Sequence, residues 1–238
     1  LVIGVQDYKR MPDALYASSD ASVFEDYARQ ALGVPRGRIV SLLDADADNI
    51  GVQDGVRRLG GIVDAKTDLY VYFAGHGFAS GQGTPYLLPH DGDARYLNQL
   101  VSRNDLFESL ARLGAGSVTV FLDTCYSGRG RSGTVLAKGM RPLVIASSNE
   151  GVPEGFTVIS AAAADEFSGD LPEAEHGLFS YFLMRGLEGE ADRDGDRAIS
   201  VEELHGYVAG EVRKQAARLG REQTPEIFGE RDRVLVRY

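Results

Sequence analysis

Buried strands are the most regular feature of the hydrophobic pattern. Runs of apolar residues rich in β-branched side chains recur along the chain, with polar segments between them. Such runs are typical of strands that are covered on both faces, as in a parallel sheet. We predict strands at 1–5, 39–43, 69–74, 117–122, 143–147 and 157–161, and a closing strand at 233–238.

Amphipathic helices are predicted between several of these strands, at 21–32, 52–63 and 105–113. Ser19 and Asp20 precede the first helix and are residues suited to a cap. Alternating strands and helices imply right-handed crossovers and an α/β fold with a mostly parallel central sheet and helices on both faces. Chemistry is expected beyond the carboxyl ends of the strands, where open α/β sheets bind their ligands.

Composition and charge narrow the class of protein. The 238 residues are 43% hydrophobic, which is sufficient for one substantial core. No repeat or change in composition divides the chain, so we expect a single domain over 1–238, as a fragment of a longer chain. The net charge of -10 argues against nucleic-acid binding and favours a cationic partner. No apolar run reaches the roughly 18 to 20 residues of a membrane span, so no membrane contact and a cytoplasmic location are expected.

Two candidate catalytic residues follow the two longest apolar runs. His76 lies between two glycines directly after the strand predicted at 69–74, and these glycines allow a sharp turn that leaves the imidazole exposed. Cys125, the only cysteine, follows the strand predicted at 117–122. Neighbouring parallel strands would bring the thiol and the imidazole together.

A thiol within reach of an imidazole is suited to cleave peptide bonds. The thiol ionises near neutral pH and attacks a carbonyl carbon, and the protonated imidazole then delivers a proton to the leaving amine. An arbitrary cysteine and histidine would more often be a packing residue and an ordinary loop residue. The context of strand ends favours Cys125 as nucleophile and His76 as its proton-transfer partner. A lone cysteine also excludes an internal disulfide.

The segments around these residues resemble the two signatures of metacaspases and bacterial caspase-like peptidases. They read Tyr-Phe-Ala-Gly-His-Gly at 72–77 and Asp-Thr-Cys-Tyr-Ser-Gly at 123–128, and the histidine precedes the cysteine by roughly 50 residues, as in caspases. The resemblance implies a three-layer caspase-like fold and a cysteine endopeptidase that forms an acyl-enzyme thioester. It also implies that the backbone amides of Gly77 and Cys125 face the tetrahedral oxyanion.

The same resemblance implies an acidic specificity pocket. In metacaspases two aspartates form the floor of the primary pocket, and Asp20 and Asp123 match their positions. Paired carboxylates in a partly desolvated pocket favour Arg or Lys, because an unpaired charge there costs roughly 2 to 5 kcal/mol. The implied substrate is a protein or peptide that is cut after a basic residue. A helix cap at Asp20 and a turn former at Asp123 are the structural alternatives.

The loop expected after the cysteine contains basic residues among glycines, and exposed loops of this kind are the usual sites of proteolytic nicking. Self-cleavage is therefore expected at Arg129, Arg131, Lys138 or Arg141. The alternative is that these side chains only solvate the loop.

The rival function is a catalytically silent interaction or regulatory module, since a fold does not guarantee activity. Fused or partner regulatory domains are expected in either case.

An acidic segment near the C-terminus follows the spacing of a calcium-binding EF-hand loop. The oxygen donors at the ligand positions are Asp192, Asp194, Asp196, Ala198 through its carbonyl, Ser200 and Glu203. Arg197 replaces the glycine that usually makes the sharp turn, and the sequence contains no obvious second hand. The competing interpretation is a capping box of Ser200 and Glu203 that begins a helix over 201–219.

The other histidines offer no metal site in the sequence. His90, His176 and His205 lack cysteine or histidine partners at the spacing of zinc ligands, so we interpret them as surface or packing residues. The predicted peptide chemistry requires no cofactor. Calcium is therefore the only ion that the sequence suggests, and its expected role is structural or regulatory.

Overall fold

The computed structural model describes residues 1–124, 151–163 and 166–238. Within these residues the centre of the molecule is a six-stranded sheet with the order β12-β8-β7-β3-β1-β2, in which only the edge strand β12 is antiparallel to its neighbour. Its strands are β1 (Val2–Gly4), β2 (Ser41–Leu43), β3 (Asp68–Ala74), β7 (Ser117–Asp123), β8 (Phe156–Ser160) and β12 (Glu226–Gly229). The predicted mostly parallel sheet is confirmed, while the strand predicted at 143–147 lies outside the described residues.

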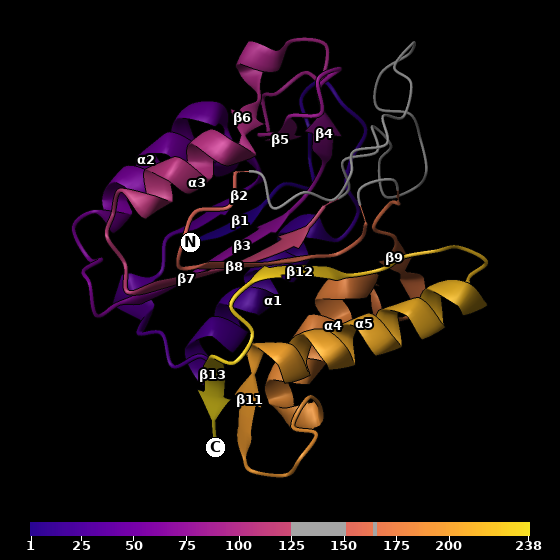
Figure 1. Cartoon of the computed structure of the whole chain (residues 1–238). Helices are drawn as coiled ribbons and strands as arrows, with labels where there is room; N and C mark the ends of the chain where they lie inside the picture. The colour runs from indigo at the N-terminus through magenta and orange to yellow at the C-terminus, as the bar shows by residue number, and fades with distance from the viewer. Residues whose placement is uncertain (125–150, 164–165) are drawn as a thin grey trace.

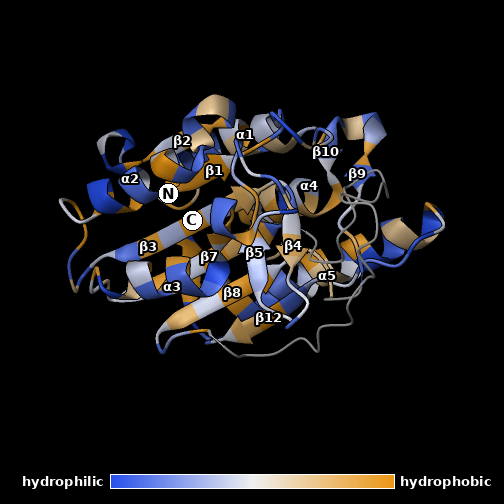
Figure 2. Ribbon diagram, turned by 90° about the horizontal axis from the view of Figure 1, so that it is seen from above, coloured by the Kyte–Doolittle hydropathy of each residue, from blue (hydrophilic) through white to orange (hydrophobic). Residues whose placement is uncertain are grey.

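Five α-helices of the described residues cover this sheet in two layers. They are α1 (Ala17–Gln30), α2 (Asn49–Leu59), α3 (Arg103–Ala111), α4 (Leu178–Arg185) and α5 (Val201–Arg218). Helices α2 and α3 lie on one face, and α1, α4 and α5 lie on the other (Figure 1). Apolar residues are concentrated in the central strands (Figure 2), and the buried ones form one hydrophobic cluster. The predicted three-layer α/β arrangement is therefore confirmed.

Shorter elements complete the described chain. Single helical turns are η1 (Arg36–Arg38), η2 (Asp44–Ala47), η3 (Leu97–Gln99), η4 (Pro172–Ala174) and η5 (Gly186–Glu190). The small strands are β4 (Gly77–Ala79), β5 (Pro85–Leu87), β6 (Val101–Ser102), β9 (Asp170–Leu171), β10 (His176–Gly177), β11 (Ala198–Ser200) and β13 (Val234–Arg237). They form an antiparallel sheet β4-β5-β6 and the pairs β9-β10 and β11-β13. No helix in the described parts of the chain combines the length and apolar character needed to cross a membrane.

The predicted cap of the first helix is wrong, because α1 begins before it. Tyr16 occupies the cap position and makes no side-chain cap bond. The hydroxyl of Ser19 donates to the carbonyl of Tyr16 at 2.9 Å, so it bonds back into the first turn. Asp20 lies inside the helix with its side chain turned to the protein interior, where it is fully buried. The capping alternative for Asp20 is thereby excluded.

Close packing of α1 on the sheet depends on a glycine in β1. A Cβ atom at Gly4 would lie 2.4 Å from the Cβ of Ala21 and 2.8 Å from the carbonyl oxygen of Ala17. A larger residue at position 4 would push the helix away, because well-packed interiors cannot absorb such overlaps without strain. The glycine thus sets the depth at which α1, and with it Asp20, lies against the sheet.

The C-terminal strand is present, but it does not close the central sheet. Strand β12 pairs with β8 and occupies that edge instead, an antiparallel strand that the hydrophobic pattern did not reveal. Strand β13 pairs with β11, with Val236 opposite Ile199. The chain turns back between α5 and β12, so its last strand reaches the end of the molecule where α5 begins (Figure 1).

Candidate active site

Strands β3 and β7 end side by side, and this register organises the site. They pair in parallel with Ala74 opposite Asp123, and the N–H of Gly75 donates to the carbonyl of Asp123 at 3.3 Å. His76 comes two residues after one strand end, and Cys125 comes two residues after the other. The predicted neighbouring strands are confirmed, while Cys125 itself lies outside the described residues.

His76 is buried, contrary to the expected exposed imidazole, since only 1% of its surface is accessible. The ring of Tyr8 stacks on the imidazole with centroids 4.8 Å apart. The Tyr8 hydroxyl also accepts the backbone N–H of His76 at 2.8 Å. The loop that follows β1 therefore covers the histidine, a tertiary contact that the glycines flanking His76 do not reveal.

A carbonyl group defines which nitrogen of His76 is basic. The Nε2 atom lies 2.8 Å from the carbonyl oxygen of Pro12. A carbonyl oxygen only accepts hydrogen bonds, so Nε2 carries the proton in the neutral ring, and Nδ1 is the nitrogen that takes up a second proton. Once the ring is protonated, the same carbonyl stabilises the positive charge. This arrangement suits a proton-transfer residue.

Glycines on both sides of His76 shape the turn after β3. Gly75 has φ 152°, and a Cβ atom there would lie 2.7 Å from the Tyr8 hydroxyl. Any side chain at this position would displace the ring that holds His76. Gly77 is buried and opens β4, opposite Leu87 of β5. The role of its amide as an oxyanion donor remains a prediction.

Asp123 is completely buried and is bonded by hydroxyl groups. Ser168 donates to its Oδ1 at 2.6 Å and Ser180 to its Oδ2 at 2.5 Å. Because the Ser180 hydrogen is directed to Asp123, the Tyr72 hydroxyl donates to the Ser180 oxygen, at 2.6 Å. These bonds join β7 to the segment that contains α4. A simple turn former would not need them, so the turn alternative for Asp123 is not supported.

Asp20 is equally buried and is bonded by the neighbouring part of that segment. His176 Nδ1 lies 2.5 Å from its Oδ1, and the backbone N–H of Gly177 donates to its Oδ2 at 2.8 Å. The hydrogen bond that His176 donates to Asp20 raises the pKa of His176 above its ordinary value, and partial burial opposes this rise. Both carboxylates thus bond to the stretch 168–180, although they come from distant parts of the chain.

Several residues of this site were missed in the sequence. Tyr8, Ser168, His176 and Ser180 contact the predicted site residues, and none was assigned a role there. Gly177 is the cap residue that precedes α4, and Ser180 lies in the first turn of that helix, so both acids bond near one helix start. The candidate self-cleavage residues lie outside the described residues: Arg129, Arg131, Lys138 and Arg141.

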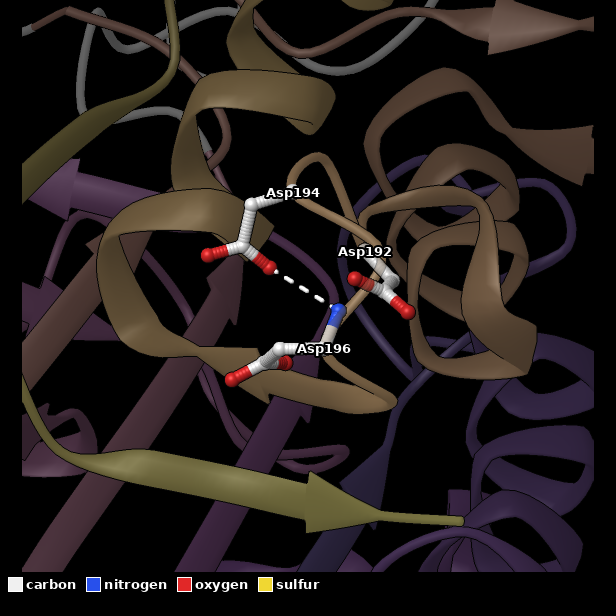
Figure 3. A group of neighbouring side chains, drawn as sticks. All are labelled: Asp192, Asp194 and Asp196. Carbon is white, nitrogen blue, oxygen red and sulfur yellow. Dashed lines mark hydrogen bonds between the residues drawn. The ribbon is translucent and has the colours of Figure 1, made fainter.

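The acidic loop after η5 forms a compact cluster with one ligand oxygen each from Asp192, Asp194 and Asp196 within 4.8 Å of one another (Figure 3). Arg197 adopts φ 65°, the left-handed conformation usually given to glycine, and its N–H donates to Asp192 at 3.1 Å. The sharp turn at position 197 therefore forms although arginine replaces the usual glycine there. Ala198, whose carbonyl oxygen is the candidate ligand, lies in β11, and β11 pairs with β13.

The capping box predicted at the end of this loop is confirmed. The Ser200 hydroxyl accepts the N–H of Glu203 at 3.2 Å, and the Glu203 carboxylate accepts the N–H of Ser200 at 2.9 Å. The second bond lowers the pKa of Glu203. A capping box and a calcium loop are compatible, because an EF-hand places its last ligand in the first turn of the following helix. Calcium binding remains a prediction.

Comparisons with known proteins identify the fold. A family model described as the caspase domain matches residues 1–235. No curated protein matches the chain. The crystal structure of protein GSU0716 from Geobacter sulfurreducens is similar over 100% of this chain and 95% of that chain, with a TM-score of 0.64 and 17% sequence identity, a likeness of fold alone. The chain belongs to the caspase-domain family of cysteine peptidases.

Proposed function

We propose that the protein is an endopeptidase that cleaves after Arg or Lys, with Cys125 as nucleophile and His76 as acid and base. The observation that carries this proposal is the register of β3 and β7, in which the two candidate residues follow paired strand ends at equal distance. The Pro12 carbonyl adds support, because it leaves Nδ1 of His76 as the proton acceptor.

The proposed reaction proceeds in two halves. His76 takes the thiol proton, and the Cys125 sulfur attacks the carbonyl carbon, giving an oxyanion that the N–H groups of Gly77 and Cys125 stabilise. The C–N bond then breaks as His76 passes its proton to the leaving amine, which leaves a thioester. Water attacks the thioester while His76 removes its proton, and the carboxylic acid and the thiol are released. The Pro12 carbonyl stabilises the imidazolium in both halves.

The proposed basic specificity rests on Asp20 and Asp123. A carboxylate offers about four acceptor sites, so the hydrogen bonds that each acid accepts from the stretch 168–180 are compatible with a further bond from a substrate cation. Ser168 and Ser180 are neutral donors, so neither brings a positive charge next to Asp123. Two acids in a desolvated site favour a guanidinium or ammonium and exclude a third carboxylate.

A matched peptide series tests this proposal. Peptides that differ only in the residue before the scissile bond, as Arg, Lys, citrulline or Asp, are to be compared by kcat/KM with purified protein. We expect Arg and Lys peptides to be cut at least about 100-fold faster than the Asp peptide, because a buried unpaired charge costs several kcal/mol. Preferential cleavage after Asp would overturn the pocket assignment, and no cleavage of any peptide would favour a silent regulatory module.

We also propose calcium as the ligand of the loop 192–203. At a calcium concentration about 100 times Kd, mass action stabilises the folded state by about 2.7 kcal/mol. For a chain of this size that corresponds to a rise in Tm of about 5 to 10 °C. Asp194→Asn should abolish the rise, whereas Glu202→Gln, an exposed acid that bonds Arg231, should retain it. An unchanged melting curve for the wild-type protein in millimolar calcium would leave the capping box as the only role of Glu203.

A further inference from the structure

The two pocket acids differ in the kind of donor that they bind. Asp123 receives hydrogen bonds from Ser168 and Ser180, whose hydroxyl groups do not titrate in the physiological range. Asp20 receives one bond from the Gly177 amide and one from His176. Histidine is the side chain whose charge changes between about pH 5 and 8. The charge of one donor to Asp20 therefore depends on pH, whereas the two serine donors to Asp123 stay neutral.

We propose that His176 sets the charge of the acidic pocket, and through it the preference for a cationic residue before the scissile bond. This inference rests on the proposed function of Asp20 and Asp123 as the pocket. With His176 protonated, the pair of His176 and Asp20 is neutral overall. With His176 neutral, Nδ1–H still donates to Asp20, and the pair carries one net negative charge. His176 acts through Asp20 and is therefore a positioning residue.

The surroundings of His176 favour such a titration. Asp20 faces it from α1, Glu175 precedes it in the chain, and the ring of Tyr181 from α4 lies 6.1 Å away. The two acids raise the pKa of His176, with the hydrogen bond to Asp20 as the largest cause. The His176 side chain is 24% exposed, whereas that of Asp20 is fully buried. His176 can therefore exchange a proton with solvent without exposing the acid.

The direction of the effect follows from this pKa. Below the raised pKa of His176, the imidazolium competes with a substrate cation for Asp20, so selectivity for Arg is low. Above it, the competing charge is lost and selectivity is high. Linkage requires the reciprocal effect as well: binding of a cationic substrate lowers the pKa of His176 and releases a proton.

The ratio of kcat/KM for an Arg peptide to that for its citrulline counterpart isolates this effect. Citrulline has nearly the shape of Arg without the charge, and both peptides use the same Cys125 and His76, so titration of the catalytic pair cancels in the ratio. Arg itself stays charged throughout. We expect the ratio to rise about tenfold between about pH 5.5 and 9.5. A neighbouring charge typically changes such an equilibrium by about one to three powers of ten, and tenfold is the smallest of these changes.

Two variants and one control complete the test. His176→Asn retains an N–H donor near Asp20, so its ratio should be high at every pH, whereas that of Asp20→Asn should be low at every pH. His205→Gln is the control, because His205 contacts the Pro225 carbonyl instead of an acid and should leave the rise unchanged. A wild-type ratio near one at all pH values would overturn the proposed function. A ratio above one that does not change with pH, or that still rises in His176→Asn, would overturn the role of His176 alone.

Discussion

Replacement of Cys125 or of His76 by Ala is expected to lower kcat for a basic peptide at least about 10³-fold. The reason is that a thiol without its imidazole is mostly protonated near neutral pH, and an imidazole without the thiol has no nucleophile to activate. Because the two groups act as a unit, the double variant should be no slower than the slower single variant. Steady-state kinetics with an Arg peptide measures all three.

The controls for this prediction separate chemistry from folding. His205→Ala replaces a half-buried histidine away from the strand ends and should retain activity close to that of the wild type. Cys125→Ala should also keep the wild-type Tm within a few degrees, because a small apolar residue replaces a thiol. If Cys125→Ala kept more than about a tenth of the activity, the two-residue mechanism would be wrong.

Asp123→Asn is expected to reduce the preference for Arg over citrulline about 100-fold, because losing one partner of a buried charge pair costs about 2 to 5 kcal/mol. The amide still accepts one serine hydroxyl and can donate to the other, so the fold should persist. Asp68→Asn is a matched control, since Asp68 accepts the Ser117 hydroxyl at the opposite end of the same strand pair. Equal losses in both variants would show a general effect of charge and contradict the pocket.

The sequence predicts the central sheet well for a physical reason. Each parallel strand is covered on both faces, so its burial appears as a continuous apolar run, as in β3 and β7. The ends of these runs are paired in the sheet, and His76 and Cys125 each follow in the sequence two residues later. Strands β12, β4, β5 and β6 are only two to four residues long, so they do not give such a run.

The hydrogen-bond partners of the site are the part that sequence patterns do not predict. His176 and Asp20 are separated by 156 residues, and Ser168 and Asp123 by 45. Such contacts depend on how α1 and α4 pack, and no local periodicity encodes them. The same limit explains the first helix: Asp20 satisfies local capping rules, yet its carboxylate bonds to a distant strand and helix start. Tertiary packing decided its role.

The donors that satisfy the two buried acids come late in the chain, and this order has a consequence for biosynthesis. Asp20, Asp123 and four parallel strands leave the ribosome before Ser168 and His176 are made. Burying carboxylates without donors is costly, so the nascent first half keeps them hydrated. A nascent chain that has not yet reached Ser168 therefore lacks the serine and histidine donors of both acids, and the two carboxylates can be buried only after residues 168–180 have been added.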